Sequence, residues 1–305
     1  MINVKIEKIF YKGWDNCIQI TNGIVDLIMT TDIGPRIIRY GFLHMENEMC
    51  EVESMMGLTG GDEWRIYGGH RLWHSPESRD RTYESDNNPV AWEKIQDGVK
   101  TIQDIEQKTG IKKEMEITLS QDSSRVRILH RLTNSGPGTA ELSVWSISAM
   151  ATGGKEIIPQ SRKDTDLLPN RIISLWPYTK LNDPRVYWGE KFIILQQDPR
   201  LKQPFKFGVL NERGWAAYFN HNHLFMKYYK HDSNAKYPDF GVSYETYTND
   251  FMLEMETLSP LTLLQPGASV EHVERWELFD NVPMPSNNEE EIEKIIASYN
   301  TNQIQ

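Results

Sequence analysis

Apolar and polar side chains alternate along most of this chain, and this two-residue period constrains the fold more than any other feature. In residues 111–119, for example, Met115, Ile117 and Leu119 share one face, and polar or charged residues lie between them. Successive side chains of a β-strand point to opposite faces, so such runs indicate strands with one face buried. The pattern recurs often enough to predict roughly fifteen or more strands.

Helical spacing is clear in one place, near the C-terminus. Asn288 precedes three glutamates, and isoleucines follow at helical intervals, which predicts a helix over residues 288–299. Strands do not alternate with helices elsewhere, which argues against a parallel α/β sheet. There is also no linker and no clear repeat. We therefore predict an all-β protein: a large antiparallel β-sandwich in a single domain over residues 1–305, with a short C-terminal helix.

Two segments break the strand rhythm, residues 55–89 and 152–185. Both are rich in glycine or proline, and the first also contains several aromatic residues. Irregular segments of this length in a compact domain are usually functional or disordered, and the aromatic residues of the first argue against disorder. We expect two long loops on one side of the sandwich.

Charge and composition narrow the possible partners and the compartment. The net charge of -10 argues against broad binding of nucleic acid or anionic membranes, which needs a basic surface. The two cysteines have no metal-ligand or redox spacing, residues 1–7 lack the apolar core of a signal peptide, and no stretch is apolar enough to span a bilayer. We expect a cytoplasmic protein without a metal or cofactor.

The segment Tyr67–Glu77 carries the densest functional chemistry. Its potentially functional residues are Gly68, Gly69, His70, Arg71, Trp73, His74 and Glu77. The glycine pair permits close approach of a ligand, the arginine offers a fork of donors, the histidines exchange protons near neutral pH, and the tryptophan offers a flat apolar face. This combination suits a sugar. The alternative is a surface loop whose tryptophan packs inward and whose charges are solvated.

Other candidate groups lie on strands. Glu254 and Glu256 are two residues apart and therefore point to the same face of one strand, which is either an exposed edge or the wall of an acidic cleft. His130 lies on an otherwise apolar face, and we interpret it as a hydrogen-bonded core histidine.

Three stretches resemble the galactose mutarotase-like superfamily, the large β-sandwich of aldose 1-epimerases. They are the early strand with Gly34 and Arg36-Ile37-Ile38, the segment Tyr67–His74, and Glu254-Met255-Glu256-Thr257 followed by Pro266-Gly267 and a strand ending in Trp276-Glu277-Leu278. The chain is most similar to a poorly characterised branch with a Gly-Gly-His-Arg-Leu-Trp loop.

The resemblance implies roles for several residues. Glu256 matches the general base of the family, with Glu254 as the alternative. The base removes the proton of the anomeric hydroxyl, the ring opens, and an acid protonates the ring oxygen. Arg71 would hold sugar hydroxyls, and Trp73 or Trp64 would stack on a sugar face.

The chain departs from the family at the expected acid. Residues 144–150 contain no histidine where the family has its acid histidine. The resemblance then implies that His74 or His70 has taken this role, or that the protein binds sugar without turning it over.

Three functions follow as alternatives. The first is an aldose 1-epimerase-like isomerase with Glu256 as base and His74 as acid. The second is a non-catalytic sugar-binding or sensing protein. The third is a glycoside hydrolase or polysaccharide lyase-related protein, in which Glu77 would face Glu256 across a cleft. In each case the ligand is a small-molecule carbohydrate, and the protein is a monomer or homodimer.

Overall fold

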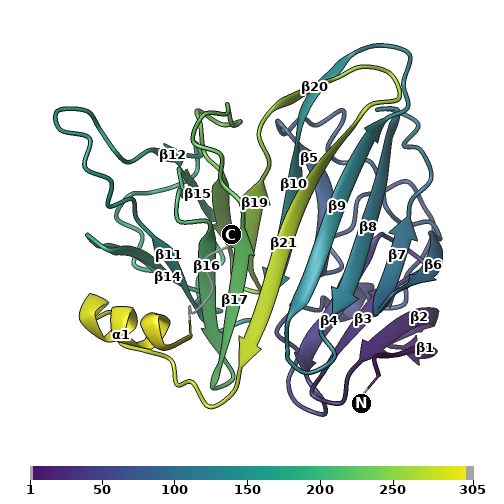
Figure 1. Ribbon diagram of the computed structural model, residues 1–305, viewed down its shortest axis with the longest axis horizontal. Coiled ribbons are helices and arrows are strands. Elements are labelled where there is room, and N and C mark those ends of the chain that lie inside the picture. Colours follow the sequence, from purple (N-terminus) through teal and green to yellow (C-terminus); the bar gives the residue numbers. More distant parts are fainter. Residues whose placement is uncertain (1–2, 300–305) are drawn as a thin grey trace.

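The computed structural model describes residues 3–299, in which two antiparallel β-sheets lie face to face (Figure 1). The first sheet has 11 strands. In spatial order they are β1 (Lys5–Tyr11), β2 (Trp14–Thr21), β3 (Val25–Thr30), β4 (Arg36–Phe42), β5 (Gly69–Ser75), β10 (Ala140–Met150), β19 (Leu253–Leu258), β18 (Tyr244–Thr248), β15 (Phe205–Val209) and β12 (Ile173–Leu175), with β20 (Thr262–Leu264) paired to β10.

The second sheet has 10 strands. Their order is β13 (Val186–Trp188), β14 (Phe192–Gln196), β11 (Lys155–Pro159), β16 (Trp215–Asn220), β17 (His223–Tyr229), β21 (Ser269–Phe279), β9 (Val126–Asn134), β8 (Ile111–Leu119), β7 (Gly98–Ile102) and β6 (Ala91–Ile95). A short 3₁₀ turn, η1 (Glu53–Met55), and a helix, α1 (Glu289–Tyr299), complete the described elements. The predicted β-sandwich with a C-terminal helix is confirmed.

The main core fills the space between the sheets. Leu72, Val144 and Met255 of the first sheet belong to the same buried cluster as Met115 and Trp276 of the second. This follows from the two-residue period, because each strand turns every second side chain toward the opposite sheet.

The helix covers the outer face of the second sheet. Ile292 and Ile296 are buried in a separate cluster that includes residues of β11, β14, β16 and β17. The Asn288 side chain accepts hydrogen bonds from the backbone of Glu290 and Glu291 at 2.9 and 3.0 Å, so the predicted helix start is correct. Within residues 3–299, no helix combines the length and apolar character needed to cross a membrane.

Three strands lie where we expected loops. β5 occupies the middle of the first segment expected to be irregular, and β11 and β12 lie in the second. Every residue of β5 is buried, so its two faces are both covered and the sequence shows no alternation. The expectation of continuous loops over 55–89 and 152–185 was therefore wrong at these strands.

Candidate functional site

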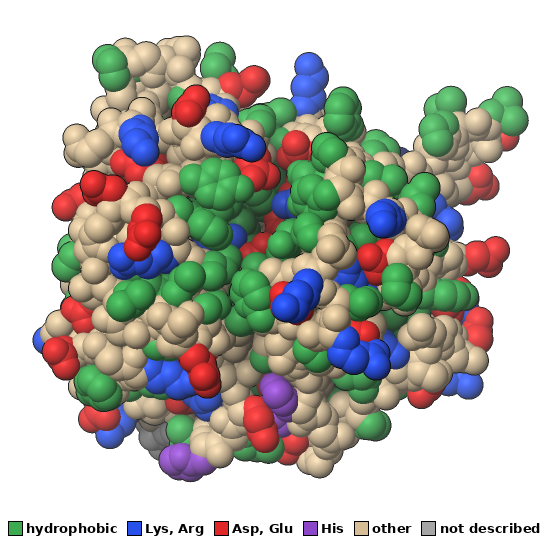
Figure 2. Space-filling view, turned by 180° about the vertical axis from the view of Figure 1, so that it is seen from behind, with side chains coloured by type: hydrophobic (Ala, Val, Ile, Leu, Met, Phe, Trp, Pro, Cys, Tyr) green, Lys and Arg blue, Asp and Glu red, His purple; other side chains and the backbone are tan. Residues whose placement is uncertain are grey.

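The outer face of the first sheet is hollowed over its central strands. β5, β10, β19, β18 and β15 are consecutive neighbours there. Arg71 of β5 pairs with Ile147 of β10, which pairs with Glu256 of β19, and these three side chains leave the same face of the sheet. Figure 2 shows this face, with a hollow near its centre that has acidic side chains at its floor and hydrophobic ones around it.

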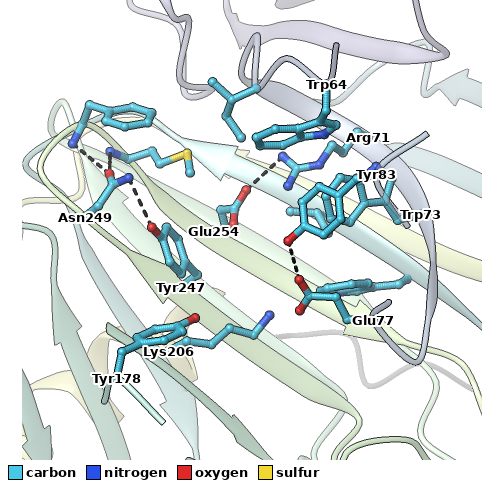
Figure 3. Close-up of a pocket in the computed structure, with 15 residues that line it drawn as sticks. Trp64, Arg71, Trp73, Glu77, Tyr83, Tyr178, Lys206, Tyr247, Asn249 and Glu254 are labelled. Atoms are coloured by element: carbon cyan, nitrogen blue, oxygen red, sulfur yellow. Dashed lines mark hydrogen bonds and ion pairs between the residues drawn. The ribbon is translucent and has the colours of Figure 1, made fainter. Parts of the chain in front are cut away.

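The cavity has a volume of about 310 Å³. Side chains from the sheet form its floor, and loops close its sides (Figure 3). The lining residues are Trp64, Ile66, Arg71, Trp73, Glu77, Tyr83, Trp145, Ile147, Tyr178, Lys206, Tyr247, Asn249, Phe251, Met252 and Glu254.

Aromatic rings form one wall of the cavity. The ring centre of Trp73 lies 5.9 Å from that of Trp64, 5.3 Å from that of Tyr83 and 5.4 Å from that of Trp145. Trp64 and Tyr83 both come from the 55–89 segment, so this loop folds back over its own strand β5. The contacting rings support one another, which fixes their faces without a ligand.

An arginine–carboxylate pair lies at the back of the cavity. The Arg71 guanidinium is 2.9 Å from Glu254 and stacks over the Trp73 ring at 4.5 Å from its centre. Burial raises the pKa of the Glu254 carboxyl, Arg71 opposes this rise, and the neighbouring Glu256 adds to it. The pair thus presents planar hydrogen-bonding groups beside an aromatic face, and the pKa of its carboxyl is raised above the usual value.

Lys206 forms a second charged group in the cavity. Its ammonium lies 2.8 Å from both Glu245 and Glu256, and the Trp145 indole N–H donates to Glu256 at 2.7 Å. Burial lowers the pKa of Lys206, but the two carboxylates raise it well above its usual value. Lys206 therefore remains charged.

Glu256, the predicted base, lies beneath the cavity wall. Its exposed fraction is 0%, and it is absent from the lining residues, whereas Glu254 is among them. Trp145 and Lys206, which both bond to Glu256, separate it from the open space. Of the two predicted carboxylates, the structure brings Glu254 to the cavity.

The predicted acid, His74, leaves the opposite face of the sheet. Arg71 and Trp73 point into the cavity, so the alternating His70 and His74 point into the space between the sheets. His74 lies 3.6 Å from Glu106 there, and burial lowers its pKa. The structure therefore does not bring His74 together with Glu256 or with the cavity.

His70 belongs to a buried hydrogen-bond network. Its two ring nitrogens contact Ser148 at 2.8 Å and His130 at 2.7 Å, and His130 also bonds to the backbone oxygen of His272 at 3.1 Å. Burial lowers the pKa of both His70 and His130, so both rings are neutral. The interpretation of His130 as a core histidine is confirmed.

This network also contains the one group of potential metal ligands found among residues 3–299. Ligand atoms of His70, His130 and Glu274 lie within 4.8 Å of one another. However, the ring nitrogens of both histidines already have protein partners, and the Lys227 ammonium lies 2.9 Å from Glu274. These contacts satisfy the cluster as a structural network.

The other predicted binding residues reach the cavity. Arg71, Trp73, Glu77 and Trp64 all line it, and the Tyr83 hydroxyl donates a hydrogen bond to Glu77 at the rim. Figure 3 shows Trp64, Trp73 and Tyr83 on one side and Tyr178, Lys206 and Tyr247 on the other.

Several lining residues were not predicted from the sequence, and Lys206 is the most informative of them. It lies in the strand Phe205-Lys206-Phe207-Gly208-Val209, where a single charge interrupts an apolar run. A lysine inside such a run must find carboxylate partners when the strand is buried. That signal could have identified Lys206, but not its partners Glu245 and Glu256.

The architecture matches known structures closely enough to identify its fold. A galactose mutarotase-like protein from Lactobacillus casei superimposes with a TM-score of 0.60 at 10% identity over 87% of this chain and 100% of that chain. A galactose mutarotase-like protein from Clostridium acetobutylicum superimposes with a TM-score of 0.55 at 13% identity, over 91% of this chain and 99% of that chain. A protein from Synechocystis sp. PCC 6803 superimposes with a TM-score of 0.60 at 11% identity, over 89% of this chain and 99% of that chain.

The chain has the galactose mutarotase-like fold. No protein-family model matches the sequence, and no curated protein matches it. The expected fold is thus confirmed, whereas identities of this size show nothing about the reaction or the substrate.

Proposed function

We propose that this protein binds a carbohydrate in the cavity on the outer face of the first sheet. The observation that carries the proposal is the Arg71–Glu254 pair set against the Trp73 ring, in a cavity that Trp64 and Trp145 also line. A sugar ring has an apolar face and a rim of hydroxyl groups. Aromatic faces suit the first, and paired donors and acceptors suit the second.

Binding can be tested by calorimetric titration of a panel of aldoses into the wild-type protein and Trp64→Ala. Trp64 is half-buried in the loop over the cavity, so the variant should fold while affinity falls about tenfold or more. Trp92→Ala is the matched control, because Trp92 is also half-buried but lies on β6 of the second sheet. Equal losses in the two variants, or no heat with any aldose, would argue against the proposal.

Interconversion of sugar anomers is the second candidate function, and the raised pKa of Glu254 favours it. A carboxyl with a raised pKa is a stronger base than an ordinary glutamate and is suited to accept the proton of the anomeric hydroxyl. Lys206, held in its charged form, would stabilise the negative charge that develops on the ring oxygen as the ring opens. In this proposal Glu254 replaces Glu256 as the base, and Glu256 positions Lys206.

NMR exchange between α and β anomers tests this reaction. We expect Glu254→Gln to abolish protein-dependent exchange while the sugar still binds, because the amide keeps the shape of the carboxyl but cannot accept the proton. Loss of exchange in Glu256→Gln with exchange retained in Glu254→Gln would return the role of base to Glu256. Binding without exchange for any sugar would leave carbohydrate binding as the function.

A further inference from the structure

A second hollow adjoins the cavity across the Glu77–Tyr83 pair. It has a volume of about 650 Å³, and its lining residues are Glu77, Ser78, Arg79, Tyr83, Trp176 and Asp239. Glu77 and Tyr83 line both spaces and are hydrogen-bonded to each other. The two hollows therefore share one wall.

Lys206 and Trp176 form a second connection between the hollows. Lys206 lines the first, Trp176 lines the second, and the Lys206 ammonium lies 4.7 Å from the centre of the Trp176 ring. The same ammonium lies 4.6 Å from the centre of Trp145 in the first hollow. One cation thus contacts an aromatic ring in each space.

The segment that carries Trp176 is held in place by hydrogen bonds. The Thr179 N–H donates to the Trp176 carbonyl at 2.9 Å, which closes a turn. The Lys206 N–H then donates to the Thr179 hydroxyl at 3.0 Å, which ties this turn to β15. An anchored segment of this kind loses less conformational entropy than a mobile loop when a ligand stacks on its aromatic ring.

Asp239, another lining residue of the second hollow, is also tied to the sheet. The Asp239 carbonyl accepts a hydrogen bond from Ser174 of β12 at 2.6 Å, and its carboxylate accepts one from Ser75 of β5 at 3.4 Å. Arg79 is exposed and adds guanidinium donors to the lining of this hollow. The second hollow therefore repeats the chemistry of the first: an aromatic face, an arginine and carboxylates.

We propose that the ligand spans both hollows and is a disaccharide or a longer saccharide, with Trp176 as the platform for its second sugar unit; this inference rests on the proposed carbohydrate binding. The first cavity, at about 310 Å³, is at the small end of ligand pockets, which range over about 300–1,000 Å³. It accommodates one sugar ring. The adjoining hollow extends the site past Glu77 and Tyr83, and its polar groups match further hydroxyls.

The test is calorimetry with matched series, each consisting of a methyl monosaccharide, the disaccharide and the trisaccharide of one sugar. We expect the disaccharide to bind about tenfold or more tightly than the monosaccharide, the gain of one added stacking contact. In Trp176→Ala the affinity ratio of disaccharide to monosaccharide should fall to near one. Arg79→Ala, at an exposed position, should reduce the same ratio and provides a second variant should Trp176→Ala fail to fold. Tyr187→Ala, an exposed aromatic on β13 outside both hollows, should keep the wild-type ratio.

Each other result overturns the inference. Equal affinity for the monosaccharide and disaccharide in every series would confine the ligand to the first cavity and leave carbohydrate binding intact. An unchanged ratio in both Trp176→Ala and Arg79→Ala would place the second unit elsewhere. No binding in any series would overturn this inference and the proposed function together.

Discussion

The role of each ionisable residue in this protein depends on the face of the strand from which it projects. Arg71 and His70 are adjacent in β5, yet Arg71 contacts Glu254 in the cavity and His70 contacts His130 between the sheets. Burial lowers the pKa of His70, whereas burial raises that of Glu254. Desolvation disfavours the charged form of both groups, so the histidine becomes neutral and the carboxyl becomes more basic.

His74→Gln tests the assignment of faces. We expect sugar affinity to change less than twofold, because His74 projects away from the cavity, and the free energy of unfolding to fall by about 1–3 kcal/mol, because Glu106 loses a buried partner. Arg71→Gln, three positions earlier on the other face, should instead weaken sugar binding about tenfold or more. Calorimetry and urea unfolding measure the two effects. Loss of sugar binding in His74→Gln at unchanged stability would refute this assignment.

Glu156 makes stability depend on pH. It is fully buried on β11 and accepts a hydrogen bond from the Tyr244 hydroxyl, and burial raises its pKa to about 8. The unfolded chain has a glutamate pKa of about 4.3, so the native state binds this proton more tightly. The contribution of this tighter proton binding to the free energy of unfolding is fully present below about pH 4, and it is lost as the pH rises toward about 8.

Glu156→Gln should remove this loss of stability at rising pH, because the amide does not titrate. Between pH 5 and 8, the free energy of unfolding of the wild type should fall relative to that of the variant by more than about 1 kcal/mol. Urea unfolding at several pH values measures the difference. Glu93→Gln, at an exposed position of β6, is the control: its free energy of unfolding should change with pH as that of the wild type does. A constant difference between wild type and Glu156→Gln would show that Glu156 titrates normally.

At the scale of single elements, β5 determines the shape of the site, and its glycine pair lets it enter the sheet. Gly68 and Gly69 both have positive φ, at 98° and 69°. A Cβ on Gly68 would lie 2.1 Å from the Cys50 carbonyl oxygen, and one on Gly69 would lie 2.4 Å from that of Ile37. The backbone of β5 can therefore lie against these neighbours only without side chains at its start.

Gly68→Ala should lower the free energy of unfolding by more than about 2 kcal/mol, because strain at positive φ adds to a clash with the backbone. Gly60→Ala is the matched control: its φ is 65°, but a Cβ there meets nothing within 4 Å. We expect the free energy of unfolding of this control to fall by about 1 kcal/mol, from backbone strain alone. Equal costs in urea unfolding would show that close packing against Cys50 is unimportant.

At the scale of the whole molecule, the two sheets have different outer surfaces. The first sheet leaves its outer face open as the cavity, whereas α1 covers part of the second with Ile292 and Ile296 (Figure 1). The helix has eleven residues, which makes it marginal in isolation, so its stability comes from this docking. The covered face is structural, and the open face is available for a ligand.

Ile292→Ala should lower the free energy of unfolding by about 2–5 kcal/mol, because it leaves a cavity under the helix. Sugar affinity should remain unchanged, since the helix contacts the other sheet. Lys294→Ala, at an exposed position of the same helix, should cost less than about 0.5 kcal/mol. Chemical denaturation with calorimetry of the folded variants gives both values. A stability loss below 1 kcal/mol would mean that the helix is not docked as described.

The sequence by itself determined the fold class, the C-terminal helix and part of the site. The two-residue period requires sheets with one covered face, and Asn288 with the following glutamates marks the helix start. The residue types at Arg71 and Trp73 are sufficient to predict a sugar ligand. The period also placed Glu254 and Glu256 on one face.

The tertiary structure alone decided which of those groups are accessible. A period of two separates the faces of a strand, but it does not say which face another sheet covers, so His74 could not be excluded from the site. Glu254 and Glu256 lie on the same face of β19. They differ in accessibility because Lys206 and Trp145 cover Glu256. These partners are 50 and 111 residues away in sequence, and strand order, which local pattern does not encode, brings them together.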